Sequence, residues 1–257
     1  MVSKRYIGKV CAYCGKEGAA TTADHVIARE FFFRDDRGNL PQVPACNECN
    51  NDKSKLEHYV TAALMAGSRL AEGDRYRSEM VSPRLAKNQK LAREMGIGKP
   101  PVWTNVNGIL QPMHELIIDP NKINQLMGLI AKGLYFHHFG KPLSSDFYAE
   151  AKTIDPNKEA ALWASMADYF PVEATRVGDD LGNGTFVYAG ARSTANEFFS
   201  AWQMAWHNGI PLHGGGAPPQ GIAVFWVVTR PTPEAVARAN RVKEVQPSPS
   251  EGPAQFE

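Results

Sequence analysis

The sequence has few cysteines and few of the features that mark secreted or membrane proteins. Its four cysteines are Cys11, Cys14, Cys46 and Cys49, so the rest of the 257 residues contains none. A scaffold held by many disulfides is thereby excluded. No apolar run approaches the roughly 18 residues of a membrane-spanning helix, and the polar, basic start MVSKRYIGKV differs from a secretory signal. We therefore expect a cytoplasmic protein without a membrane segment.

The chain also lacks a large excess of charge of either sign. Its formal net charge is +1, so no basic field covers the whole molecule, and any surface for nucleic acid must be local. The one local basic run is residues 69–99, where four acidic residues stand against eight Lys or Arg: Arg69, Arg75, Arg77, Arg84, Lys87, Lys90, Arg93 and Lys99. These residues can follow a nucleic-acid backbone, or they can be the ordinary charged surface of an exposed helix and linker.

The cysteines form two C-x-x-C pairs, which residues 15–45 separate. Each pair can supply two thiolates to one tetrahedral zinc ion, and four thiolates complete such a site. The segment between the pairs is longer than the usual zinc-finger spacer, so it must fold into something of its own. We predict a structural Zn²⁺ bound by all four cysteines, with unrelated buried thiols as the alternative.

The segment inside this loop predicts two short strands and a turn. In TTADHVIARE, residues 21–30, the apolar pair Val26 and Ile27 indicates a strand. FFFRDDRGNL then brings an apolar patch and turn residues, and PQVPAC forms a second extended piece. From Cys46 to Gly73 the chain lacks proline and is rich in helix formers. The expected order is knuckle, strand, turn, strand and helix.

Three polar side chains can meet where this helix starts. Asp24 and His25 lie in the first predicted strand, and Asn50 directly follows Cys49. On a helix Cys46 and Cys49 share one face, and Asn50 is rotated by about 100° from Cys49. A zinc ion would therefore clamp the helix start and turn Asn50 toward the strand. Carboxylate and amide oxygens suit a hard cation such as Mg²⁺, and a neutral histidine beside them suits a general base.

The combination of CAYCG, DHV and VPACNECNNDK resembles an HNH endonuclease of the zinc-containing ββα-metal (His-Me finger) class. The resemblance covers roughly residues 8–60 and rests on a specific combination of motifs. A DH pair lies between two C-x-x-C pairs, an asparagine directly follows the last cysteine, and a lysine comes three residues later. A DH pair alone would carry little information.

The resemblance implies a role for each motif residue. His25 would be the general base, and Asp24 and Asn50 would bind a catalytic Mg²⁺ or Mn²⁺. The four cysteines would hold structural zinc. Hydrolysis by such a site would leave 5′-phosphate and 3′-hydroxyl ends. The metal would act as Lewis acid and template, while the histidine takes a proton from the attacking water.

Other positions of the motif are less regular. The family asparagine that supports the loop beside the catalytic histidine corresponds to Asn39, but strict spacing would place it at Pro41 because NLPQVPAC is two residues longer than the family pattern. Ala28 stands where the family often has proline. Lys53 and Arg29 are candidates to hold substrate phosphates, or they are solvated surface charges.

The strand geometry leaves an alternative open. Successive residues on a regular strand point to opposite faces, so Asp24 and His25 should diverge unless the strand ends, bends or bulges there. In the alternative, Asp24 caps a turn and His25 packs within it. The module would then bind nucleic acid without cutting it.

The remainder of the chain predicts a second, larger unit. Residues 119–140 carry the signals of one helix, with Asp119 as N-cap, Pro120 at the first position and Gly140 as the stop. Residues 184–191, 199–208 and 221–230 are predicted as strands of one antiparallel sheet backed by helices. No P-loop and no G-x-S-x-G nucleophile motif accompanies them, so neither enzyme class is indicated.

We predict an α+β protein of four segments. These are a zinc-stapled HNH module (1–68), a basic helical linker (69–100), an α+β domain with a small antiparallel sheet and unknown role (101–245), and a disordered tail rich in proline, serine and glutamate (246–257). The C-terminal domain can form a homodimer or bind a protein partner.

The resemblance implies a metal-dependent endonuclease that hydrolyses phosphodiester bonds, with double-stranded DNA as the expected substrate. Proteins of this build commonly act in bacterial or phage restriction, antiviral defence or mobile elements. Two alternatives stay open. One is a nuclease directed to RNA or to junctions with the same site, and the other is a non-catalytic, zinc-dependent module that binds nucleic acid.

Overall fold

The computed structural model describes residues 5–66, 68, 72–106, 108–113, 116–154, 156–210 and 223–245. The predicted tail, residues 246–257, lies outside the described residues. Within the described part of the chain, no helix combines the length and the apolar character needed to cross a membrane.

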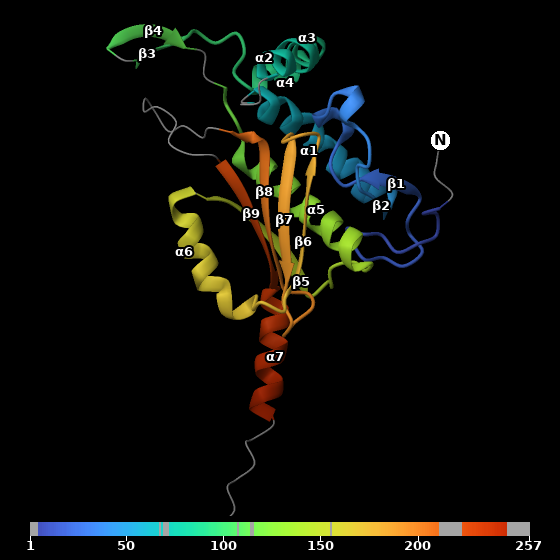
Figure 1. Cartoon of the computed structure of the whole chain (residues 1–257). Coiled ribbons are helices and arrows are strands. Elements are labelled where there is room, and N and C mark those ends of the chain that lie inside the picture. Colours follow the sequence, from blue (N-terminus) through green and yellow to red (C-terminus); the bar gives the residue numbers. More distant parts are fainter. Residues whose placement is uncertain are drawn as a thin grey trace, which may run out of the picture.

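The N-terminal module consists of two short strands and one long helix. β1 (Thr22–His25) pairs antiparallel with β2 (Gln42–Ala45), and α1 (Asn47–Ala66) follows almost at once. Two 3-10 turns, η1 (Arg29–Phe31) and η2 (Arg34–Asp36), lie between the strands. The predicted order of strand, turn, strand and helix is confirmed, and the module is drawn in blue in Figure 1.

Short helices and a hairpin connect this module to the rest of the chain. The helical segments are α2 (Gly73–Arg75), the π-helical η3 (Tyr76–Val81), α3 (Ser82–Lys87) and α4 (Gln89–Glu94). The hairpin of β3 (Val102–Val106) and β4 (Ile109–Met113) follows and stands apart from the other elements in Figure 1.

The C-terminal part is built around an antiparallel sheet. Its helices are α5 (Pro120–Phe139), α6 (Pro156–Met166), the short 3-10 helix η4 (Ala167–Tyr169) and α7 (Pro233–Val245). Its strands are β5 (Phe147–Ile154), β6 (Thr175–Leu181), β7 (Phe186–Arg192), β8 (Ser200–Ile210) and β9 (Ala223–Pro231). They form one five-stranded sheet in the order β5-β9-β8-β7-β6. Mixed helix and strand content with small antiparallel sheets confirms the α+β prediction.

Helix α5 has the termini that its sequence predicts. The Asp119 side chain accepts a hydrogen bond from the backbone N–H of Asn121 at 2.9 Å, and Pro120 opens the helix. Gly140 ends it with a φ of 73°, a left-handed conformation that glycine adopts without steric cost.

Two of the five strands are not predicted from the sequence, and both form edges of the sheet. The three central strands, β7, β8 and β9, correspond to the three predicted ones. β6, with the sequence TRVGDDL, is exposed at most positions and carries a glycine and two aspartates, which are rare in strands. β5 occupies the opposite edge.

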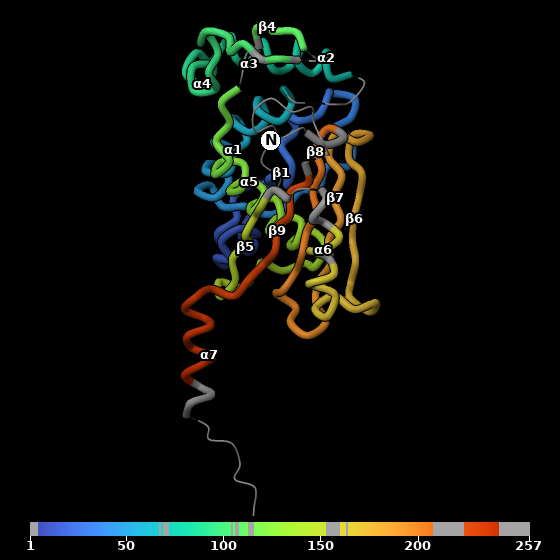
Figure 2. The backbone as a smooth tube through the Cα atoms, turned by 90° about the vertical axis from the view of Figure 1, so that its left-hand side faces the viewer, coloured from blue at the N-terminus to red at the C-terminus, as the bar shows by residue number. Residues whose placement is uncertain are grey.

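The sheet separates two apolar layers. On β8 the side chains of Trp202, Met204 and Trp206 enter the larger core, whereas Ala201 enters the smaller one, as the alternation along a strand requires. Figures 1 and 2 show α5 on one face of the sheet and α6 on the other. In Figure 1 α7 extends from the end of the sheet away from the other elements.

The N-terminal module and the C-terminal part share the larger core. Gly133 lies on α5, and a Cβ atom added there would lie 2.8 Å from Val26 Cγ1 and 3.3 Å from the Tyr13 hydroxyl. Such a close approach of helix backbone to neighbouring side chains is possible only with glycine at this position. Residues of β2, α1, α5 and the five-stranded sheet therefore contribute to one continuous core.

The surroundings of α1 change along its length. Its first turns are half-buried or exposed, apart from the buried Lys53, whereas residues from Tyr59 to Met65 are buried around the whole helix. Contacts with α5, η3 and β8 provide this cover. The second half of α1 thus anchors the module in the core, and its first half presents polar side chains beside β1.

Candidate metal and catalytic site

The four cysteine sulfurs converge at the start of α1. Cys11 and Cys14 lie in the N-terminal turn, Cys46 and Cys49 lie where α1 begins, and all four Sγ atoms are within 4.8 Å of one another. The Cys14 and Cys46 sulfurs are 3.9 Å apart. Bonds of about 2.3 Å to a tetrahedral zinc would place two sulfurs about 3.8 Å apart. All four thiols are free, and their arrangement suits a zinc ion.

The surroundings of the sulfurs also favour a bound cation. The backbone N–H of Cys46 donates to Cys11 Sγ at 3.4 Å, and that of Cys49 donates to Cys46 Sγ at 3.5 Å. Burial raises the pKa of the Cys49 thiol, and the neighbouring sulfurs raise it further. Four thiolates this close repel one another unless a metal ion compensates their charge, so the residues fit Zn²⁺.

Asp24 and His25 end β1 and point to opposite sides of it. Asp24 is paired with Val43 and is buried, whereas His25 is paired with Gln42 and is half-buried. The strand stops at His25 without a bulge. The carboxylate therefore faces α1 and the imidazole faces the side of Gln42, as strand geometry predicts.

A buried ion-pair network holds the Asp24 carboxylate. Its Oδ2 accepts a hydrogen bond from the Tyr13 hydroxyl and lies 3.0 Å from the Lys53 ammonium. The same ammonium donates to the Glu57 carboxylate and, at 2.8 Å, to the carbonyl oxygen of His25. The Lys53 side chain is 0% exposed. Lys53 thus joins the end of β1 to α1 at the two residues predicted for catalysis.

This position differs from the phosphate contact that the sequence predicts for Lys53. A phosphate approaching the ammonium would meet Asp24 and Glu57, so the geometry favours a positioning role. Glu57 is not identified from the sequence. Burial raises its pKa to about 7, against the opposing effect of Lys53. The i, i+4 spacing of these two residues on α1 is the signal that could have indicated the pair.

The His25 imidazole is within hydrogen-bond distance of the Gln42 side chain. The Gln42 amide nitrogen lies 2.8 Å from His25 Nε2, across the ladder from β1 to β2. An amide carries both a donor and an acceptor, so Gln42 can meet either tautomer of the ring once its amide rotates. With Nε2 held in this way, Nδ1 is the nitrogen that remains for another partner. Sequence spacing alone did not identify Gln42.

His25 is held in the form that a general base requires. Burial lowers the pKa of the imidazole, and the positive charge of Arg29 lowers it further, while Asp24 has the opposite effect. The ring is therefore neutral near pH 7, where an unperturbed histidine is already mostly neutral. It remains half-buried rather than enclosed, so water can reach it.

The other predicted site residues lie around this centre. Asn50 is half-buried, one turn before Lys53 on α1, and among the described residues its side chain has no hydrogen bond to Asp24 or His25. Asn39 lies in the exposed turn before β2 with a φ of 59°, which asparagine tolerates. Arg29 is exposed in η1. The functional roles assigned to these three residues stay predictions.

The oxygen atoms near β1 fit a weakly held divalent cation better than a tight cage. Tyr13 and Lys53 both contact Asp24 Oδ2, so Oδ1 is the oxygen left for a metal. One carboxylate oxygen and the Asn50 amide would leave most of the coordination sphere to water and substrate. Mg²⁺ is commonly bound in this way, because it dehydrates reluctantly.

Comparison with known proteins assigns the N-terminal module. Residues 11–56 match the family model of the HNH endonuclease. The matched segment contains all four cysteines, β1, β2 and the first half of α1, and the chain beyond it lies outside the match. No curated protein and no solved structure matches the chain. The N-terminal part therefore carries an HNH endonuclease domain, as the motifs predict.

Proposed function

We propose that this protein is a metal-dependent endonuclease that hydrolyses phosphodiester bonds in double-stranded DNA. The observation that carries the proposal is the environment of His25 within the HNH match. A half-buried imidazole with a lowered pKa has Nε2 held by Gln42 and stands at the strand end beside a fixed carboxylate. A histidine in this state can accept a proton at neutral pH.

In the proposed reaction His25 removes a proton from a water molecule. The water oxygen attacks phosphorus, the bond from phosphorus to the 3′ oxygen breaks, and the departing oxygen takes a proton from solvent. Gln42 holds the ring so that one nitrogen faces the water. With the Gln42 amide rotated, its oxygen accepts from Nε2–H of the neutral ring, so Nδ1 is the nitrogen that takes the proton, and the imidazolium that forms keeps the same hydrogen bond from Nε2.

Asp24 and Asn50 would hold the catalytic Mg²⁺ or Mn²⁺. When bound, the cation supplies Lewis-acid stabilisation of the phosphate charge and of the leaving oxygen. Tyr13 and Lys53 orient Asp24 so that its second oxygen is presented in one direction. Since the Lys53 ammonium also holds the His25 carbonyl oxygen, one side chain fixes the carboxylate and the backbone of the base together.

Zinc at the four cysteines would have a structural role. The ion would connect the turn of Cys11 and Cys14 to the start of α1 and so place Asn50 relative to β1. Four protein ligands complete a tetrahedral zinc and leave no open position for water, which separates it from a catalytic zinc.

The experiment offers the zinc-loaded protein supercoiled plasmid, single-stranded DNA and RNA in turn, with Mg²⁺ or Mn²⁺ added. Nicking or linearisation of the plasmid with either metal is the expected result. Cleavage of RNA but not of DNA would favour the alternative in which the nuclease acts on RNA. Binding of nucleic acid without any cleavage would support the non-catalytic alternative.

A further inference from the structure

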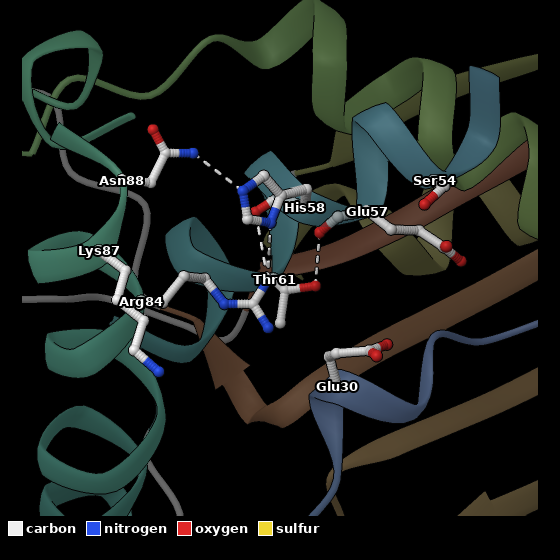
Figure 3. A pocket seen from close by; sticks show the side chains of 8 residues that line it. All are labelled: Glu30, Ser54, Glu57, His58, Thr61, Arg84, Lys87 and Asn88. Atoms are coloured by element: carbon white, nitrogen blue, oxygen red, sulfur yellow. Dashed lines mark hydrogen bonds between the residues drawn. The ribbon is translucent and has the colours of Figure 1, made fainter. Parts of the chain in front are cut away.

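A cavity of about 630 Å³ lies beside α1, outside the cysteine cluster and the Asp24 and His25 pair. Figure 3 shows it between two walls. One wall is the face of α1 with His58 and Thr61, and the other is formed by Arg84, Lys87 and Asn88 at the end of α3. Arg84 and Lys87 belong to the basic stretch of the sequence, which here folds back over α1.

The cavity adjoins the candidate active site through one side chain. Glu57 lines the cavity, and its carboxylate accepts a hydrogen bond from Lys53. Lys53 in turn lies 3.0 Å from Asp24 Oδ2 and 2.8 Å from the His25 carbonyl oxygen. Glu57 and Lys53, both on α1, therefore lie between the cavity and the end of β1.

The hydrogen bonds of Asn88 fix the state of His58. The Asn88 Oδ1 accepts from the backbone N–H of Leu91 at 3.0 Å, so its Nδ2 is the atom that faces His58 Nε2 at 2.9 Å. Nε2 must then accept the hydrogen bond, and in a neutral ring Nδ1 carries the proton. Nδ1 faces Arg84 Nη1 at 3.4 Å, so a donor meets a donor.

Arg84 is consequently short of acceptors. A guanidinium has five N–H donors, and among the described residues the acceptor left to this one is the His58 carbonyl oxygen at 3.4 Å. Among the residues that the structure describes, neither Arg84 nor Lys87 forms an ion pair. Burial lowers the pKa of Arg84, and the charge of Glu30 only partly offsets this. A partly desolvated cation that forms no ion pair with the described residues favours an anionic ligand.

The two acidic residues that line the cavity, Glu57 and Glu30, form no ion pair with Arg84 or Lys87 in the described part of the chain. In Figure 3 the Glu57 carboxylate points away from Arg84, and this carboxylate accepts a hydrogen bond from Lys53. Glu30 projects from η1 across the cavity and is exposed. Arg84 and Lys87 therefore present two positive charges to the same space.

We propose that Arg84 and Lys87 bind a backbone phosphate of the nucleic-acid strand whose scissile bond lies at His25. The proposal rests on the proposed function and adds a substrate contact outside the HNH match. From Asn50 to His58 the rise along α1 is about 12 Å. Along B-DNA this corresponds to about three to four base pairs. The bound phosphate would thus lie a few nucleotides from the cleaved bond.

The test measures binding of the full chain to a labelled DNA duplex by fluorescence anisotropy, without added divalent metal. The salt concentration is varied from about 50 to about 200 mM, and log K is plotted against log salt. Arg84→Gln and Lys87→Gln should each make the slope shallower by up to about 0.9, the value for one lost phosphate contact. Lys90→Gln is the matched control, because Lys90 is an exposed basic residue that does not line the cavity.

An unchanged slope in both cavity variants would overturn the proposal, and so would an equal change in Lys90→Gln. Calorimetry with inorganic phosphate and a nucleoside monophosphate separates the two sources of the anion. If Arg84→Gln abolishes binding of these ligands but leaves the DNA slope unchanged, the proposal is also overturned. Because the assay needs no cleavage, a protein that shows the expected slopes but never cuts would refute the nuclease function alone.

Discussion

His25 and Gln42 face each other across the antiparallel ladder of β1 and β2, with 2.8 Å between His25 Nε2 and the Gln42 amide nitrogen. Of the two residues, one is half-buried and the other exposed. The contact occupies Nε2 and leaves Nδ1, the second ring nitrogen, for another partner. In the proposed reaction, orientation of the general base therefore depends on a residue that the HNH motif does not name.

Removing the Gln42 amide should slow catalysis without weakening binding. We expect Gln42→Ala to lower kcat by about 10-fold or more with KM nearly unchanged, since a misplaced base reacts slowly. Gln42→Glu should act differently. A carboxylate next to the ring raises the pKa of His25, so the acidic limb of the pH-rate profile should move to higher pH.

The control for Gln42 is Gln111→Glu, the same change at an exposed position of β4. It should leave kcat and the pH-rate profile as they are in the wild type. A Gln42→Glu profile identical to that of the wild type would refute the orienting role.

Arg29 should set the pH range of activity through its charge. Burial and Arg29 both lower the pKa of His25 from its ordinary 6.5, so the wild-type rate should fall as pH drops through a value below 6.5. In Arg29→Gln the pKa rises toward 6.5, and activity should be lost at a higher pH while the rate above pH 8 is retained. A raised KM with an unmoved acidic limb would instead show that Arg29 contacts substrate, as the sequence predicts.

Two lysines on α1 form ion pairs that should contribute very different amounts to the free energy of unfolding. Lys53 is buried with Asp24 and Glu57, whereas the pair of Lys55 and Asp52 is exposed. Lys53→Met leaves two carboxylates without their cation and should lower the free energy of unfolding by about 3 to 5 kcal/mol. Lys55→Met should change it by less than about 1 kcal/mol.

Urea unfolding at two pH values checks the cause of this difference. Burial raises the pKa of Glu57 to about 7, and loss of Lys53 would raise it further. At pH 5 Glu57 is neutral with or without Lys53, whereas at pH 8 only the wild type has the Lys53 ammonium to stabilise the ionised carboxylate, so Lys53→Met should lose more stability at pH 8. Equal losses at both pH values would contradict the ion-pair explanation.

Loss of a cysteine should affect the fold, whereas loss of the catalytic metal should affect only cleavage. Cys46→Ser removes one of four zinc ligands, and we expect lower zinc content and unfolding of the N-terminal module, which added Mg²⁺ cannot restore. Mild chelation should stop cleavage while the fold and the zinc remain, and Mg²⁺ should reverse it. Zinc content, circular dichroism and plasmid cleavage are measured on the same samples. A protein free of zinc that folds and cuts would contradict this account.

The local features of the module could be predicted from the sequence because local spacing encodes them. Two C-x-x-C pairs indicate the cysteine cluster, and a proline-free run after Cys46 indicates α1. The termini of α5 follow from Asp119 and Gly140 in the same way. Each of these signals lies within a few residues of the feature that it predicts.

The contacts around the site could not be predicted, because they depend on register and packing. A slip of one residue in the β1–β2 ladder would replace Gln42 beside His25 by Pro41 or Val43. The burial of Lys53 requires β1, the Tyr13 turn and α1 to come together. The cavity exists only because residues far along the chain fold back over α1.

Cleavage of supercoiled plasmid by the wild type and by His25→Ala, both zinc-loaded and in Mg²⁺, tests the central claim most directly. The wild type should nick or linearise the plasmid, and His25→Ala should be slower by about 10² to 10⁴ with unchanged DNA affinity. His137→Ala, at the end of α5 and outside the site, should cut like the wild type. Equal cleavage by wild type and His25→Ala would contradict the account, and so would a folded, zinc-loaded wild type that cuts nothing.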